Sequence, residues 1–293
     1  MHISINHFNP FLSLGPFLIE VKFYQPFRTI IHEFFLETEI NWIIKYSKPR
    51  LTKSRAAVDS FHLREIGSSA PNNINSKDKT QVTVKKAVTT WLKDIEYIED
   101  QHYPLGLMDG EVILADHIFV KDPYNYKVEN PIMFDVSRRI ELVTHFNVTT
   151  RYGASNYQTT HYGLSGMVVP HVDPVGYESG VKLPEKRLDL IGTGDYIATF
   201  MGWLEETEAG GGTAFISKGF EETLETTKGS AAFWTNLGSC HRKEDRSEHG
   251  GCPVLKGSKW IINKWINSWD QWKGWPCKLF SGQDLPVFAG MSV

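Results

Sequence analysis

Two side chains that can bind a metal ion stand two residues apart in an otherwise apolar segment. Residues 168–174 read VVPHVDP, with His171 and Asp173 at the polar positions. In a β-strand, residues i and i+2 point to the same face of the sheet, so the imidazole and the carboxylate would project together. The segment therefore predicts a strand that presents a pair of metal ligands.

A third ligand has to come from elsewhere, and the stretch CHRKEDRSEHGGCPV offers His241 and His249. Two histidines and one carboxylate leave coordination positions open, as in non-haem Fe(II) oxygenases. Zinc is the alternative metal, although zinc hydrolases more often carry a His pair on a helix with a nearby Glu base. The residues by themselves leave open which histidine completes the site. A surface His-x-Asp pair without metal also fits them.

The segment GSKWIINKWI places a lysine on a strand with strict alternation. One face of this strand carries Lys259, Ile261, Asn263, Trp265 and Asn267. If that face looks into a barrel, the ammonium of Lys259 needs an anion, because a buried, unpaired charge is costly. A carboxylate co-substrate would meet this need. The periodicity does not decide between this face and the opposite one, which carries Trp260.

The elements that must position these residues change in character along the chain. Apolar residues at helical spacing predict helices over 30–45, 84–99 and 133–144, with a loop at 66–81 and turn formers at 121–131. After about Asn156, β-branched and aromatic runs alternate with Gly-rich turns, as in YQTTHYG, DYIATFMGWL and SAAFWTNL. This pattern is typical of a sandwich or jelly-roll barrel. We expect an α+β, mainly β protein whose helices come first.

Composition excludes some classes of function. The formal charge of −3 and the mixed 22% of charged residues show no nucleic-acid footprint. The chain lacks the run of roughly 18 apolar residues that a membrane-spanning helix needs. The apolar patch Phe11–Ile19 is broken by Gly15 and Pro16 and has no basic segment before it, which makes a poor signal peptide. A surface strand or a disordered lead-in is the alternative.

Several of these segments together resemble the catalytic domain of collagen prolyl 4-hydroxylase α subunits. The blocks HYGLSGMVVPHVD, GTGDYIATFMGWL, EAGGGTAFI, GSAAFWTNL, HGGCPVLKGSKWIINKW and the closing WPC follow one another in the family's order. The strong match covers about Val143–Cys277, and a weaker one includes FLETEINWIIKYSKPRLTKS. The resemblance implies a double-stranded β-helix (jelly roll) with flanking N-terminal helices.

The resemblance also implies a ligand set for iron. His171, Asp173 and His249 match the family's ligands. His249 is preferred to His241 because it stands before a Cys-Pro-Val-Leu segment, ten residues ahead of Lys259. No catalytic residue beyond these ligands is implied.

The matching co-substrate positions are Lys259, Tyr162, Thr213 and Trp265. By resemblance, Lys259 pairs with the far carboxylate of 2-oxoglutarate, Tyr162 and Thr213 help to hold the same molecule, and Trp265 forms a pocket wall. The implied cofactors are Fe(II), 2-oxoglutarate, dioxygen and L-ascorbate.

Three positions depart from the family pattern. Val168, Tyr196 and Asn267 stand where family members usually carry Tyr, Arg and His in the peptide-substrate site. The resemblance therefore implies oxygenase chemistry on peptidyl proline, giving 4-hydroxyproline in collagen-like or other secreted proteins. A 2-oxoglutarate oxygenase acting on a different peptide or residue, or a catalytically silent binding partner that retains the fold, is the alternative.

The family also carries a disulfide at the positions of Cys252 and Cys277, which would leave Cys240 free. A setting in the endoplasmic-reticulum lumen follows from this resemblance, and a protein disulfide-isomerase subunit is a further partner that it raises. We expect a lead-in over 1–27 that is disordered or a degenerate signal. A helical N-terminal part of the catalytic domain over 28–150, the β-helix core over 151–277 and a C-terminal tail over 278–293 would follow.

Overall fold

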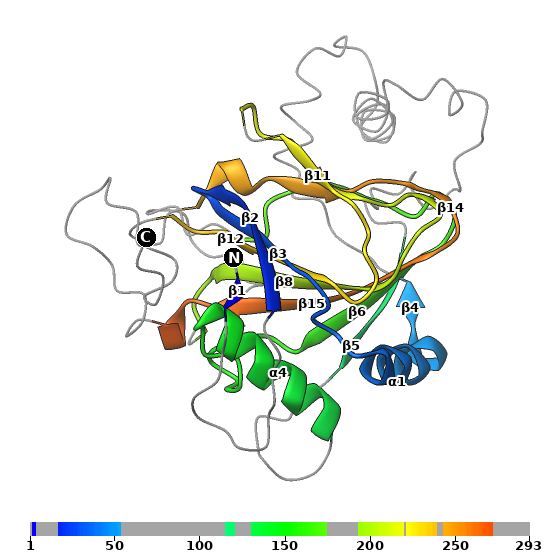
Figure 1. Cartoon of the computed structure of the whole chain (residues 1–293), viewed down its shortest axis with the longest axis horizontal. Helices are drawn as coiled ribbons and strands as arrows, with labels where there is room; N and C mark the ends of the chain where they lie inside the picture. Colours follow the sequence, from blue (N-terminus) through cyan, green and yellow to red (C-terminus); the bar gives the residue numbers. More distant parts are fainter. Residues whose placement is uncertain are drawn as a thin grey trace, which may run out of the picture.

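The computed structural model describes residues 2–3, 17–53, 115–120, 130–174, 193–219, 221–238 and 243–271. Within these residues the chain is mainly antiparallel β-structure (Figure 1). The strands are β1 His2–Ile3, β2 Phe17–Tyr24, β3 Phe27–Ile31, β4 Thr52–Lys53, β5 Asp116–Val120, β6 Tyr157–Tyr162, β7 Val168–His171, β8 Tyr196–Glu205, β9 Ala209–Gly210, β10 Thr213–Phe215, β11 Glu222–Leu224, β12 Ala231–Thr235, β13 His249–Gly251, β14 Val254–Lys256 and β15 Lys259–Asn267. The helices are α1 Glu37–Ser47 and α4 Pro131–Thr144, with short 3₁₀ turns at Lys48–Arg50, Asp245–Ser247 and Trp269–Gln271.

The strands form one large and one smaller sheet, and a short pair joins β14 to β9. The large sheet has nine described strands in the order β1-β2-β3-β12-β8-β15-β6-β5-β4, and the smaller has four in the order β11-β10-β13-β7. One buried cluster takes Met201, Trp203 and Ile261 from the large sheet and Phe215 and Leu224 from the smaller one. The two sheets therefore face each other, as the predicted double-stranded β-helix requires.

The opposite face of the large sheet is covered by the two helices, which lie on the side away from β11 and β14 (Figure 1). Ile40 of α1 and Ile140 of α4 belong to the same buried cluster as Trp260 and Ile262 of β15. The two helices are also joined by a buried ion pair between Arg139 and Glu39. The side chains on the two faces of β15 thus belong to two different cores. The inner face points between the two sheets and carries Ile261 and the buried Lys259.

The first predicted helix begins later than the periodicity suggested. Residues 30 and 31 belong to β3, whose Ile31 pairs with Ala231 of β12, and α1 starts only at Glu37. The backbone turns between the two elements, and the Leu36 N–H donates to the Glu39 carboxylate at 2.9 Å, which caps the helix start. The backbone N–H and C=O groups of the β-branched run before the turn are hydrogen-bonded in the sheet instead.

The predicted helix over 133–144 is confirmed, although it starts at Pro131, which was expected as a turn former. Pro131 occupies the first helical position, where a missing N–H costs nothing. The side chain of Asn130 caps this end by accepting from the Met133 N–H at 3.3 Å. The predicted helix over 84–99 and the loop over 66–81 lie outside the described residues.

The large sheet extends into the segment that was expected as a lead-in. Residues 17–24 form β2, and its Ile19 pairs with Ile31 of β3. Backbone pairing and the burial of Ile19 hold this strand in place, so residues 17–24 form a strand, which was one of the alternatives for this segment. No helix in the described part is long and apolar enough to span a membrane.

Candidate metal centre and co-substrate site

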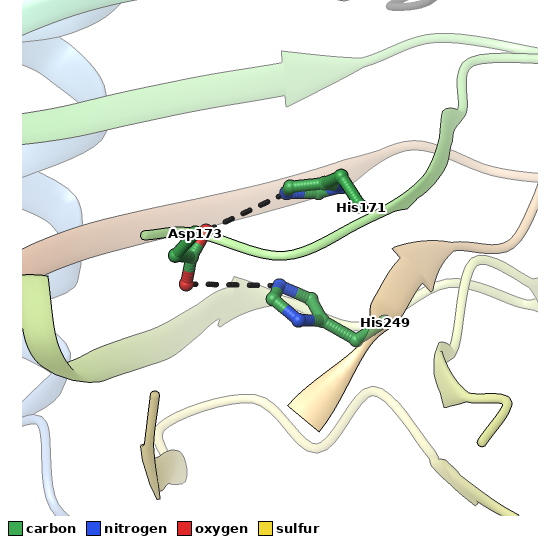
Figure 2. A group of neighbouring side chains, drawn as sticks. All are labelled: His171, Asp173 and His249. Atoms are coloured by element: carbon green, nitrogen blue, oxygen red, sulfur yellow. Dashed lines mark ion pairs between the residues drawn. The ribbon is translucent and has the colours of Figure 1, made fainter. Parts of the chain in front are cut away.

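Three metal-binding side chains meet because β7 pairs with β13 in the smaller sheet. His249 opens β13 and its Cα is the register partner of His171, the last residue of β7. Asp173 follows two residues later, past the end of β7, and its carboxylate lies beside the imidazole of His171. Figure 2 shows the carboxylate of Asp173 on one side of both imidazole rings, with an ion pair from one of its oxygens to each ring. The predicted pairing of His171 with Asp173 is thus completed by a histidine distant in sequence.

The geometry of the cluster suits one small ion. The candidate ligand atoms all lie within 4.8 Å of one another. The Nε2 of His171 is 3.5 Å from Asp173 Oδ1, and the Nε2 of His249 is 3.8 Å from Asp173 Oδ2. Among the described residues, no fourth His, Cys, Asp or Glu joins this group.

Backbone carbonyl groups orient both imidazole rings. The Nδ1 of His171 lies 2.9 Å from the Val169 carbonyl oxygen, and the Nδ1 of His249 lies 2.9 Å from the Ser247 carbonyl oxygen. A carbonyl oxygen can only accept, so Nδ1 of each imidazole donates to it, and Nε2 is the nitrogen that faces Asp173 and is left for a metal ion. This is the tautomer that binds a metal through Nε2.

Burial and charge shift the pKa values of all three groups. Burial lowers the pKa of His249 to about 4, so this imidazole is neutral at pH 7. Burial alone would raise the pKa of Asp173, but His249, His171 and Thr199 together hold it well below its usual range. Burial opposes the charged form of His171 as well, yet its hydrogen bond to Asp173 raises the pKa overall.

Aromatic rings pack around His249 and leave little freedom for its imidazole. The ring centroid of His249 lies 4.8 Å from Trp234, 5.4 Å from Phe215 and 4.6 Å from His171. The side chains of His249 and Asp173 are 7% and 5% exposed, whereas that of His171 is 38% exposed. Solvent and small molecules therefore reach the cluster on the His171 side.

This donor set fits Fe(II) and does not fit a structural zinc site. Two imidazole nitrogens and one carboxylate converge on one point, which is the donor set of the facial arrangement in non-haem iron sites. A structural zinc site would be closed by four protein ligands. Which ion is bound and which residues hold it stay predictions.

The second charged group of the site is Lys259 on the inner face of β15. Its residue is 2% exposed, and its Nζ lies 5.4 Å from the ring centroid of Tyr162, its register partner on β6. A Cβ built on Gly251 would lie 3.9 Å from this Nζ. Gly251 is two residues along β13 from His249, so the ammonium stands beside the strand that carries the metal-binding histidine.

Burial lowers the pKa of Lys259 from 10.5 to about 8, and the nearby thiol of Cys252 offsets only a part of that effect. Within the described residues no carboxylate forms an ion pair with this ammonium. The group is therefore prepared to receive an anion, as the sequence argument anticipated for a buried lysine.

Two other predicted co-substrate residues surround the same space. Thr213 of β10 is buried and pairs with Gly251, and Tyr162 is buried against Lys259. The third, Trp265, lies farther along β15, where its register partner is Thr199. The structure thus gathers Tyr162 and Thr213 with Lys259 and places Trp265 nearer to Asp173, which Thr199 contacts.

The three candidate substrate residues fall into two places. Val168 of β7 is half-buried and faces Gly251 across the strand pair. Tyr196 is the first residue of β8 and Asn267 is the last residue of β15, and the two are register partners. The half-buried ring of Tyr196 stacks on Trp265, with the centroids 5.7 Å apart and the planes at 25°. His241, Cys240 and Cys277 lie outside the described residues, so the proposed disulfide with Cys252 stays a prediction.

The sequence reasoning missed two polar residues that contact this centre. Thr199 donates a hydrogen bond to Asp173, and Asn236 donates to Thr199 at 2.8 Å. Both stand at inward positions of apolar segments, YIATFMGWL and FWTNL. A buried polar residue in such a strand needs a partner, and this signal could have identified them.

A family model and curated proteins both match this chain. Residues 157–267 match the model of the 2OG-Fe(II) oxygenase superfamily. The chain is 28% identical over 92% of its length to rat prolyl 4-hydroxylase subunit alpha-3, of which it covers 39%. It is 34% identical over 58% of its length to human prolyl 4-hydroxylase subunit alpha-1, of which it covers 30%. The chain thus spans well under half of the length of these curated relatives.

Among solved structures, the chain is similar to a viral collagen prolyl hydroxylase from Paramecium bursaria Chlorella virus-1 in complex with 2OG. The TM-score is 0.49 at 16% identity, with 84% of this chain and 97% of the other covered.

Proposed function

We propose that this chain, which carries a 2OG-Fe(II) oxygenase domain similar to those of prolyl 4-hydroxylase α subunits, hydroxylates peptidyl proline to 4-hydroxyproline. The observation that carries the proposal is that a metal-binding cluster and a buried ammonium lie next to each other along β13. A cluster of two histidines and one carboxylate lies at His249, and a buried ammonium lies beside Gly251, two residues away. A molecule with a metal-chelating end and a distant carboxylate, such as 2-oxoglutarate, matches both features.

In this proposal each residue has a distinct task. His171 and His249 would hold Fe(II) through Nε2, and Asp173 would hold it through a carboxylate oxygen. When bound, Fe(II) with 2-oxoglutarate supplies the oxidation of an unactivated C–H bond by dioxygen, with one oxygen atom entering the substrate and the other entering succinate as CO₂ leaves.

The remaining residues bind and orient. Lys259 receives the far carboxylate, and Tyr162 and Thr213 flank it. Burial of this pocket strengthens the ion pair, because water is largely excluded from it. No side chain has to act as a general base, since the hydrogen that leaves the substrate carbon is removed in the oxidation itself.

The peptide would lie against the half-buried stack of Tyr196 and Trp265. Flat aromatic surfaces receive proline rings in many recognition domains, because the pyrrolidine ring is apolar and rigid. Val168 and Asn267 complete the proposed substrate contacts. None of these side chains carries a charge, so we expect the peptide to be selected for its proline content and shape rather than for acidic or basic residues.

Similarity to prolyl 4-hydroxylase α subunits also supports a setting for the reaction. We expect an endoplasmic-reticulum location, secreted substrates that include collagen-like proteins, dependence on ascorbate and a Cys252–Cys277 disulfide. A protein disulfide-isomerase subunit is the proposed partner. The catalytic domain would span 28–277, with the β-helix core at 151–277, the helical part at 28–150 and a tail at 278–293.

The test is a coupled product assay on the purified chain with Fe(II), 2-oxoglutarate and ascorbate. A Pro-Pro-Gly repeat peptide is compared with a matched repeat in which alanine replaces proline. We expect succinate release to be stimulated by the proline peptide alone, with 4-hydroxyproline detected by mass spectrometry. Slow succinate release that ignores the peptide would point to another substrate. No succinate from folded, iron-loaded protein would favour a silent binding role.

A further inference from the structure

A chain of two hydrogen bonds leads from the candidate metal centre into the large sheet. The Thr199 hydroxyl donates to Oδ2 of Asp173. The same hydroxyl oxygen accepts from the side-chain nitrogen of Asn236 at 2.8 Å. Thr199 is 1% exposed and Asn236 is fully buried, so water does not compete for these contacts.

The direction of each hydrogen bond follows from the charge of Asp173. A carboxylate that binds a metal ion is ionised and can only accept a hydrogen bond. Thr199 has one hydroxyl proton, which it must therefore give to Asp173. Its oxygen is then free to accept, and the amide of Asn236 has to present its NH₂ group. Asn236 thus supports the direction in which Thr199 donates, because its NH₂ group cannot accept the hydroxyl proton.

The backbone holds both residues in place without help from a metal. Thr199 lies in the centre of the large sheet, where its register partners are Trp234 on β12 and Trp265 on β15. The Asn236 N–H donates to the Ile197 carbonyl at 2.9 Å, and its own carbonyl accepts from the Glu244 N–H at 2.9 Å. The donor to Asp173 is consequently preorganised.

The amide of Asn236 is not explained by stability. Its Oδ1 is buried and has no hydrogen-bond partner among the described residues. An unpaired buried acceptor costs roughly 1–3 kcal/mol, and an apolar side chain at this position would avoid that cost. The amide at this position is better explained by its NH₂ group, which contacts the residue that donates to Asp173.

We infer that Thr199 and Asn236 are positioning residues that keep Asp173 a one-oxygen ligand. With Oδ2 engaged by Thr199, Oδ1 is the oxygen left for the metal, and it already lies 3.5 Å from Nε2 of His171. A carboxylate that bound through both oxygens would occupy a second coordination position. The pair thereby reserves the positions that a chelating co-substrate and dioxygen require. This inference rests on the proposed function.

The test uses Co(II) as a visible probe of ligand number in the full chain, without 2-oxoglutarate or peptide. Thr199→Val removes the hydroxyl at nearly constant volume, Thr199→Ser restores it, and Asn236→Leu removes the orienting amide. We expect the Co(II) absorption spectrum to change in Thr199→Val and Asn236→Leu and to match wild type in Thr199→Ser. Succinate turnover should fall about 10- to 100-fold in the first two variants.

An unchanged Co(II) spectrum in Thr199→Val, with turnover near wild type, would overturn the inference. If Thr199→Val does not fold, Thr199→Ala in the same measurement decides. Failure of the proposed function is distinguishable, because wild type would then release no succinate while the spectra of the variants could still be compared.

Discussion

Replacement of Lys259 by methionine should change ligand affinity and protein stability in opposite directions. Lys259→Met keeps the unbranched apolar stem that packs near Tyr162 and removes the ammonium. The wild-type group is 2% exposed and its pKa is lowered by burial to about 8. The structure therefore predicts that this charge is unfavourable in the free protein and becomes useful only when an anion binds.

The expected changes in affinity and in stability can be estimated from the ligand-bound and the ligand-free protein. Removal of one partner of a buried, hydrogen-bonded charge pair costs about 2–5 kcal/mol, which is a roughly 30- to 4,000-fold loss of affinity for 2-oxoglutarate. A lysine pKa lowered from 10.5 to about 8 corresponds to roughly 3 kcal/mol against the charged form at neutral pH. The free energy of unfolding of ligand-free Lys259→Met should accordingly increase by up to about that amount.

The assay pairs calorimetric titration of 2-oxoglutarate with urea unfolding of the ligand-free protein. Lys256→Met is the matched control, because Lys256 is 70% exposed and pairs with Glu208 at the surface. This control should leave both measurements nearly unchanged, since an exposed ion pair contributes about 0–1 kcal/mol.

The pH dependence gives a second check. The affinity of wild type for 2-oxoglutarate should fall as the pH rises above about 8, where free Lys259 loses its proton. Wild-type stability should gain from this residue between about pH 8 and 10.5, because the unfolded chain then binds more protons at this position than the folded chain. Lys259→Met should lack both effects. An unchanged dissociation constant for 2-oxoglutarate, or a large loss of stability in Lys259→Met, would refute the reasoning.

Three further changes test other parts of the structure. His249→Ala should abolish Fe(II) binding measured by calorimetry while His241→Ala should not, and equal losses would contradict the choice of the third ligand. Gly251→Val should weaken 2-oxoglutarate binding at least about tenfold, because its Cβ would lie 3.0 Å from a methyl of Val168 and 3.9 Å from Lys259 Nζ. Gly163→Ala is the control, because the space around its Cβ is open. Similar affinity for 2-oxoglutarate in both variants would argue against a pocket at Gly251. Arg139→Met should lower the free energy of unfolding by about 3–5 kcal/mol, because it leaves the buried carboxylate of Glu39 without its cationic partner. Lys228→Met, which breaks an exposed pair with Glu37, should cost about 1 kcal/mol or less in the same urea titration, and equal costs would show that burial of the Arg139 pair is not what matters.

Local periodicity predicted much of the framework. The alternation in 259–267 identified a strand with Lys259 and Ile261 on one face, and that strand is β15. The helix over 133–144 was also found. The same reasoning failed at residues 30 and 31, because short apolar runs of β-branched residues satisfy helical and extended patterns alike. Only the pairing of β3 with β12 decides for a strand there.

For the candidate site, the sequence by itself determined that His171 and Asp173 project together, because a strand has a two-residue period. It could not decide which face of β15 is buried, since both faces enter a core, one under the helices and one between the sheets. The tertiary structure decided that His249 joins His171 through the pairing of β13 with β7, and that Lys259 reaches Gly251. It alone also brought Thr199 and Asn236 to the carboxylate. The physical reason is that hydrogen bonds and strand pairs between distant segments depend on the order of strands in a sheet, which local spacing does not encode.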